Sequence, residues 1–152
     1  MNPVIFDAHH TRNSAFVPQS KMQLRSAVDA CLELSAHDCP NGPHGPIGKW
    51  DVSNLADMSR MFSYATLFNG DLSKWDVSSA TDMSGMFFSA TGFDGDLSNW
   101  DVSSVKDMAN LFASASSMKS DLSKWDVSSV KKMFRMFWGA TSFNGDISKW
   151  VV

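Results

Sequence analysis

Apolar residues return at a fixed interval through the last two thirds of the chain. Tryptophans stand 25 residues apart, at Trp50, Trp75, Trp100, Trp125 and Trp150. After each of the first four come Asp-Val-Ser, an apolar residue, a Met, a Met-Phe pair or its variant, and an Ala. A constant period of this length is typical of proteins whose repeated units bury their apolar faces only against their neighbours. The sequence therefore predicts a stack of similar units.

Two local patterns alternate within each unit. Leu72-x-x-Trp75-x-Val77 has the spacing of a leucine-rich-repeat strand, with its three apolar side chains pointing inward. Apolar residues from Ala80 to Ala90 then step mostly by three or four positions, which predicts a short helix with one buried stripe. The predicted fold class is therefore α/β: a right-handed, LRR-like solenoid of four 25-residue strand–helix repeats with an N-terminal helical cap.

The predicted cap begins at a helix start signal. Ser20, with Gln23 three residues later, forms a capping-box pattern, and the apolar residues that follow have helical spacing to about Leu34. Without such a cap the first repeat would expose an apolar end to water. The stretch 35–49 holds three Pro and three Gly, so it is expected to be loop. The chain divides into an extended arm (1–19), the capping helix with its loop (20–49) and the repeats (50–152), the last two forming one folded unit.

The repeats resemble the BspA-like leucine-rich-repeat surface proteins, a family of mycoplasma and algal type. The shared unit reads close to W-D-V-S-x-V-x-x-M-x-x-M-F-x-x-A-x-x-F-N-x-D-L-S and recurs four times here. The chain departs from it at Leu111, Met118 and Val151. The resemblance implies an LRR-type solenoid, a cell-surface or extracellular location, a binding role and no enzyme activity.

Composition and motifs exclude several other classes. A net charge of −3 argues against a nucleic-acid-binding surface, which needs a basic patch. No run of about 18 apolar residues exists that would span a membrane. The chain carries no phosphate-binding Gly-rich loop, G-x-S-x-G or H-E-x-x-H motif, so no enzyme activity and no cofactor are predicted. The first residues lack the layout of a secretory signal, which leaves an intracellular or organellar location as the alternative to the cell surface.

Stacking would align equivalent aspartates into two rows, one directly after each Trp and one before each Leu. Carboxylates about 5 Å apart repel one another, so something must compensate their charge. One reading is a row of Ca²⁺ ions, which prefer oxygen ligands. The favoured reading is hydrogen bonding from the Ser two residues later. The rows are Asp51, Asp76, Asp101 and Asp126, and Asp71, Asp96, Asp121 and Asp146.

The outward positions of the predicted strands form a polar stripe. The exposed sheet face of a curved repeat protein is its usual partner surface, although a solvated face is an equally good reading. The candidate binding residues on this sheet face are Lys74, Asp76, Asn99, Asp101, Lys124 and Asp126.

The C-terminal end is a candidate interface. Trp138 stands where the other repeats have Ser, Phe or Ala, and Trp150 opens a last, incomplete repeat that continues with Val151. Together these residues predict an apolar patch. Truncation of a longer array explains the same pattern equally well.

Two cysteines lie across the turn from helix to loop. A disulfide between Cys31 and Cys39 would fix the cap to the first repeat in an oxidising compartment. Free thiols rank second. A zinc site with nearby histidines ranks a distant third, because the spacing is not that of a known zinc motif.

The sequence thus predicts a non-catalytic binding or adhesion module that recognises a protein or glycan through the repeat surface. A structural or accessory subunit docked in a larger protein assembly is the alternative. No ligand is identified by the sequence.

Overall fold

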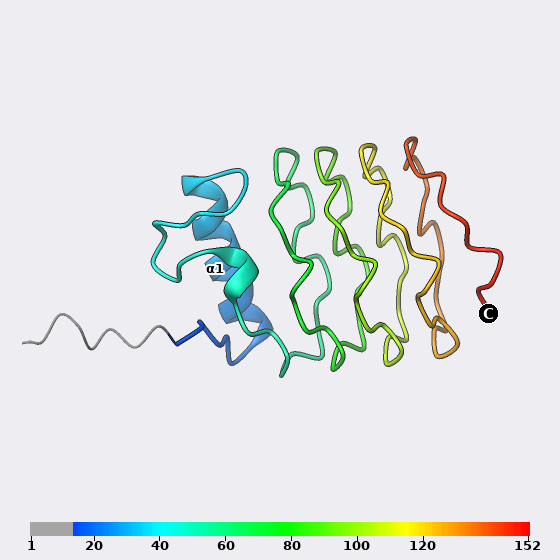
Figure 1. The fold of residues 1–152 in the computed structure, drawn as a ribbon, viewed down its shortest axis with the longest axis horizontal. Coiled ribbons are helices and arrows are strands. Elements are labelled where there is room, and N and C mark those ends of the chain that lie inside the picture. Colours follow the sequence, from blue (N-terminus) through cyan, green and yellow to red (C-terminus); the bar gives the residue numbers. More distant parts are fainter. Residues whose placement is uncertain (1–13) are drawn as a thin grey trace, which may run out of the picture.

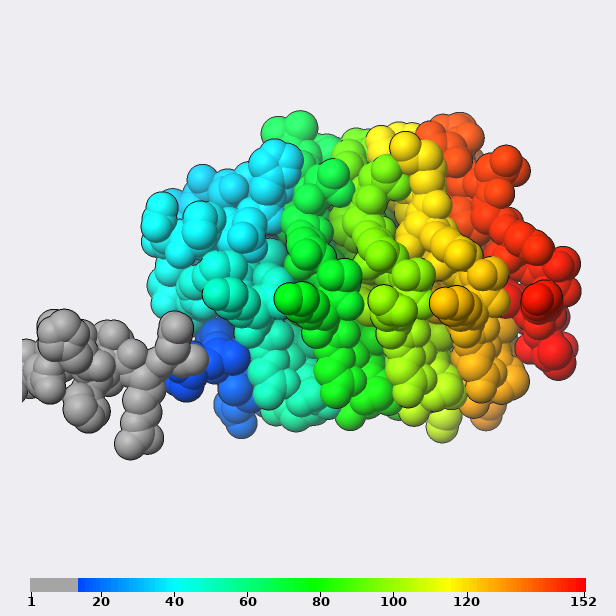
Figure 2. All heavy atoms as spheres, viewed as in Figure 1, coloured from blue at the N-terminus to red at the C-terminus, as the bar shows by residue number. Residues whose placement is uncertain are grey.

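The computed structural model describes residues 14–152, and within them helix is confined to the N-terminal third. The α-helix α1 (Lys21–Leu34) is followed by the short 3₁₀ helix η2 (Ile47–Lys49). The rest of the described chain forms four windings that stand side by side in sequence order, with α1 at one end of the row and the C-terminus at the other (Figure 1). In the space-filling view these windings are successive bands with no gap between them (Figure 2). We number the windings 1 (50–74), 2 (75–99), 3 (100–124) and 4 (125–149).

Helix α1 begins at the predicted start signal. The Ser20 hydroxyl accepts a hydrogen bond from the Gln23 backbone N–H at 3.1 Å, which satisfies one of the free N–H groups of the first turn. The Gln23 side chain accepts in turn from the backbone N–H of Gln19 rather than from that of Ser20. The helix buries Leu24, Ala27, Val28 and Cys31 against the stack.

The predicted α/β fold class is wrong. No strand and no helix occurs in the windings of the described chain. Their β-structure consists of three isolated parallel bridges, Asp57 to Asp82, Asp82 to Asp107 and Asp107 to Lys132. The stretch from Ala80 to Ala90, expected to be a helix, is a series of turns. There is consequently no sheet, and the polar stripe does not lie on a sheet face.

Left-handed residues break the expected helix. In winding 2, Gly85 and Ser89 have φ of 59° and 55°, and the equivalent residues of the other windings are also left-handed. Each such residue reverses the chain, so the hydrogen bonds within this stretch span three residues, as from Phe88 N–H to Gly85 C=O at 3.0 Å. Two turns in succession return apolar side chains to the core at intervals of three and four, the same spacing that a helix would give.

The remaining N–H groups of this stretch bond to the next winding. Met83, Gly85, Phe87 and Ser89 donate to the carbonyl groups of Asp107, Ala109, Leu111 and Ala113 at 2.8–2.9 Å, and the other neighbouring windings repeat the set. Bonds between windings thus replace the intrahelical bonds that the sequence pattern suggested, and they satisfy the buried backbone.

Aromatic rings fill the core between the windings. The rings of Phe62, Phe87, Phe112 and Phe137 stack in a column with centroid distances of 5.5–5.8 Å. A second ring, such as Phe93 in winding 2, lies flat against the column at 4.2 Å. Trp75, Trp100 and Trp125 are buried. The indole N–H of each donates to a carbonyl group 28 residues earlier, as from Trp100 to Leu72 at 3.0 Å. The core is therefore continuous along the stack.

The N-terminal segment closes one end of this core. The Phe16 ring stacks on His44 at 3.8 Å and meets the edge of Trp50 at 5.3 Å. A disulfide joins Cys31 of α1 to Cys39 of the following loop, with the two Cα atoms 5.3 Å apart. Of the predicted arm, residues 1–13 lie outside the described part of the chain.

Candidate ligand-binding face

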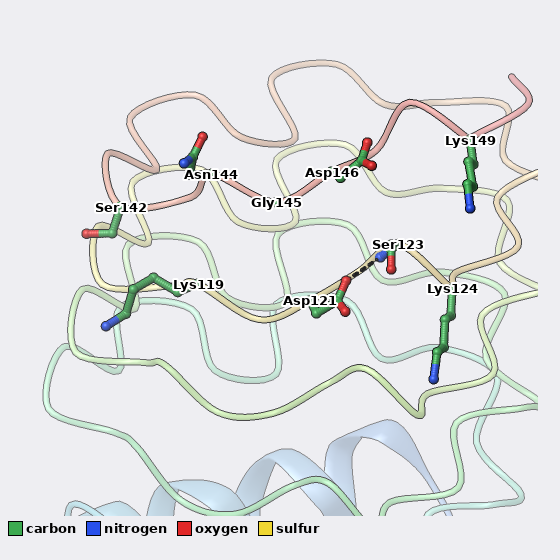
Figure 3. Close-up of a pocket in the computed structure, with 9 residues that line it drawn as sticks. All are labelled: Lys119, Asp121, Ser123, Lys124, Ser142, Asn144, Gly145, Asp146 and Lys149. Atoms are coloured by element: carbon green, nitrogen blue, oxygen red, sulfur yellow. Dashed lines mark hydrogen bonds between the residues drawn. The ribbon is translucent and has the colours of Figure 1, made fainter.

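A polar hollow of about 670 Å³ lies on the surface of windings 3 and 4 (Figure 3). Both walls come from the segment that precedes a tryptophan, so side chains of the two windings face each other in register. The lining residues are Lys119, Asp121, Ser123, Lys124, Ser142, Asn144, Gly145, Asp146 and Lys149.

Hydrogen bonds from the following serines hold the carboxylates of the hollow in place. The Ser123 N–H donates to Asp121 Oδ1 at 2.9 Å, and the Ser148 N–H donates to Asp146 Oδ1 at the same distance. These bonds lower the pKa of both aspartates from the ordinary value, because they stabilise the charged form. Each Asp therefore presents its second oxygen, Oδ2, to solvent as part of an oriented carboxylate.

Lysines supply the opposite charge. Lys124 and Lys149 extend in the same direction from neighbouring windings (Figure 3). Both side chains are exposed. Lys119 forms an ion pair with Asp94 of winding 2 at 3.2 Å, at the other end of the hollow. The face therefore offers rows of alternating charge at the spacing of the windings.

The predicted binding residues are exposed, and the structure brings only part of them to a hollow. Lys124 lines the hollow described above. Lys74 lines a smaller one, of about 170 Å³, near the N-terminal cap. Asp76, Asp101 and Asp126 directly follow buried tryptophans and lie outside both hollows. Asn99, which precedes Trp100, also lies outside them.

Both predicted Asp rows are hydrogen-bonded within their own windings. Asp101, for example, accepts from the backbone N–H of Ser103 at 3.0 Å and from its hydroxyl at 2.6 Å. These hydrogen bonds from serine compensate the charge of the aligned carboxylates. Among residues 14–152, no group of three or more His, Cys, Asp and Glu side chains is arranged to hold a metal ion.

The predicted C-terminal interface residues differ in exposure. Trp138 is 61% exposed, next to the exposed Phe134, and the guanidinium of Arg135 lies over both rings. Trp150 is partly buried, because its indole N–H donates to Leu122 C=O at 3.1 Å and its ring stacks on Trp125 at 6.4 Å. Val151 is exposed.

A second aromatic surface was not foreseen from the sequence. The exposed Tyr64 meets the edge of Phe88 at 5.2 Å, and both line a hollow of about 270 Å³ with Arg60 and Asn110. The sequence did not predict this site, because the stretch that carries it was assigned to a helix. Gly85 and Asn110, which favour left-handed backbone and are poor helix formers, were the signal against that helix.

These features define a repeat protein built from 25-residue windings that stack in register. The family model described as "Mycoplasma protein of unknown function, DUF285" matches residues 35–150, and the chain belongs to that family. Neither a curated protein nor a solved structure matches the chain. None of the helices in the described chain is long and apolar enough to cross a membrane.

Proposed function

We propose that the protein is a non-catalytic binding or adhesion module that recognises a protein or glycan through the polar hollow of windings 3 and 4. The observation that carries this proposal is the pair of aligned Asp–Lys rows with hydrogen-bonded carboxylates. Oriented carboxylates lose little conformational freedom on binding, which favours recognition of hydroxyl, amide and ammonium groups. The resemblance to BspA-like surface proteins supports the same role.

A cell-surface or extracellular location fits this proposal. The disulfide between Cys31 and Cys39 supports it, because disulfides persist in oxidising compartments.

Binding to a glycan array tests the glycan form of the proposal. We expect the double variant Lys124→Ala/Lys149→Ala to bind at least about tenfold more weakly than the unaltered protein, since each lost hydrogen bond to a charged group costs about 1.5–3 kcal/mol. The matched control is Lys106→Ala/Lys131→Ala, which removes two exposed lysines that do not line the hollow. Equal binding by both double variants would reject the hollow as the site, and no binding to any glycan would reject a glycan ligand.

A second candidate is a structural subunit docked in a larger assembly. The exposed apolar end of winding 4 favours it, with a hollow of about 330 Å³ lined by Met133, Met136, Phe137, Ile147, Trp150 and Val152. Size-exclusion chromatography separates the two candidates: a binding module is a stable monomer, whereas a subunit with an uncovered apolar end associates or aggregates when isolated.

A further inference from the structure

Two sets of backbone bonds join the windings. In the smaller set, two N–H groups of each winding donate back to one carbonyl group of the previous winding, as from Thr81 and Asp82 to Ala56. The larger set runs the other way. Four N–H groups of each winding donate to four carbonyl groups of the next, at 2.6–2.9 Å. In the last such pair the donors are Met108, Asn110, Phe112 and Ser114. Within residues 14–152, the larger set therefore leaves four carbonyl groups at the N-terminal end of the stack and four N–H groups at its C-terminal end without a neighbouring winding, in the way that a helix leaves unsatisfied groups at its two ends. The carbonyl groups are those of Asp57, Ser59, Met61 and Ser63.

Helix α1 covers the carbonyl end. Arg25 Nη1 donates to the carbonyl groups of Arg60 at 2.6 Å and Met61 at 3.2 Å. Lys21 bonds to the side chains of Asp57 and Ser59 in the same winding. Of the four carbonyl groups, that of Met61 thus gains a cationic donor, whereas Arg60 C=O, which is outside the set, also accepts from the Ser63 N–H.

The N–H end has no such cover within residues 14–152. The four equivalent donors belong to Met133, Arg135, Phe137 and Gly139, and none of them finds an acceptor in the described chain. Each of these donors lies 25 residues after the equivalent donor of winding 3, whose N–H group bonds to winding 4. The four N–H groups therefore face the position that a next winding would occupy.

Two further features of this end match the contacts found between neighbouring windings. Indole N–H groups bond to Ile47, Leu72, Leu97 and Leu122 C=O. In the described part of the chain no indole bonds to Ile147 C=O, the next carbonyl group in that series. The Phe column ends at Phe137, which is partly buried, whereas the phenylalanines before it are fully buried. The apolar hollow lies beside it.

From these matches we propose that the end of winding 4 is a docking surface for one further winding of the same 25-residue type, supplied by another stretch of polypeptide. The occupant presents carbonyl groups at alternate positions to the four N–H groups, a tryptophan indole to Ile147 C=O, and Met and Phe side chains to the apolar hollow. This inference rests on the subunit proposal and gives the class of partner.

A second copy of this protein does not fit the surface. Two C-terminal ends placed face to face would bring N–H donors against N–H donors. At the complementary carbonyl end of a second copy, α1 lies where the neighbouring winding would be, and it contacts winding 1 through Lys21 and Arg25 (Figure 1). The fitting partner is therefore a repeat segment with its carbonyl edge free.

A peptide with the sequence of residues 76–100 tests the proposal, because it begins after one tryptophan and ends on the next. It is added to the intact protein, and amide hydrogen exchange is followed by NMR. We expect exchange at Met133, Arg135, Phe137 and Gly139 to slow at least about tenfold at saturation, while the already bonded amides of winding 3 stay unchanged. A scrambled peptide should have no effect.

The matched variant is Ile147→Glu, which places a carboxylate in the apolar hollow of winding 4. It should abolish the slowing of amide exchange by the peptide. Leu67→Glu is its control, because Leu67 is an exposed apolar residue away from this end and should leave protection intact. Thermal unfolding checks that both variants fold.

Unchanged exchange at the four amides with saturating peptide would overturn the proposal, even if size-exclusion showed assembly through another surface and so supported the subunit proposal. A dimer of the protein alone that protects the same amides would also overturn it, because a second copy would then be the occupant.

Discussion

At the scale of single residues, winding 3 carries a paired exception to the repeat. Windings 1, 2 and 4 combine a Phe with a Gly two residues later, and a Cβ on that Gly would approach the ring closely, at 2.7 Å between Gly95 and Phe93. Winding 3 instead has Met118 and Ser120, both buried. The Ser120 hydroxyl accepts from the Leu97 N–H at 2.8 Å. The two positions are therefore coupled by the space they share.

A double-mutant cycle measures this coupling. Gly95→Ser alone should destabilise the protein by about 1–3 kcal/mol, because it overpacks the site against Phe93. The double variant Gly95→Ser/Phe93→Met should be more stable, by at least about 1 kcal/mol, than the sum of the two single changes in unfolding free energy would give. Urea unfolding gives the free energies. Gly95→Ser combined with Phe143→Met, whose ring belongs to winding 4, is the control and should be additive.

At the scale of elements, α1 acts as the cover of the first winding through a polar contact as well as an apolar one. Its buried face packs on the core, and Arg25 satisfies carbonyl groups of winding 1. Arg25 also forms an ion pair with Asp29 at 3.0 Å on the surface of the helix.

Arg25→Ala should lower the free energy of unfolding by about 1.5–3 kcal/mol, since the Met61 carbonyl group loses its charged donor and Arg60 C=O keeps only the bond from the Ser63 N–H. Asp29→Ala removes the surface ion pair and leaves the contacts to winding 1, so it should cost at most about 1 kcal/mol. Chemical denaturation of both variants provides the comparison. Equal losses would show that the contact with winding 1 contributes nothing.

At the scale of the whole molecule, the aligned aspartates make stability depend on pH. Hydrogen bonds from serine lower the pKa of Asp51, Asp76, Asp101 and Asp126, and the second row is lowered in the same way. A lowered pKa in the folded state means that the unfolded state binds more protons in acid. The contribution is thus complete above the unfolded value of 3.8 and is lost as pH falls through the folded values.

We therefore expect Tm to be nearly constant between about pH 7 and 5 and to fall below about pH 4. Calorimetry over this range measures the effect. Replacing Asp76 and Asp101 together by Asn should flatten the acid side of the curve, because two linked groups no longer titrate. A Tm that rises in acid would contradict the sign argued here.

Periodicity predicted the features that depend on side-chain burial alone. The spacing of Trp50 to Trp150 marked the windings, and the capping pattern at Ser20 marked the start of α1. The serine partners of the Asp rows also followed from their local spacing. These features are local, or repeat exactly, so neighbouring residues in the sequence contain the information.

The sequence did not decide how the backbone between Ala80 and Ala90 satisfies its hydrogen bonds. Apolar residues three and four apart serve a helix and a series of turns equally well. The tertiary structure decided for turns, because a neighbouring winding accepts the N–H groups that a helix would have paired internally. Likewise, stacking decides which lysines share a hollow, and which donors between Met133 and Gly139 find no acceptor among residues 14–152, since such contacts join residues of different windings. The sequence by itself determined the period and the core, and the stack determined the backbone conformation and the two surfaces.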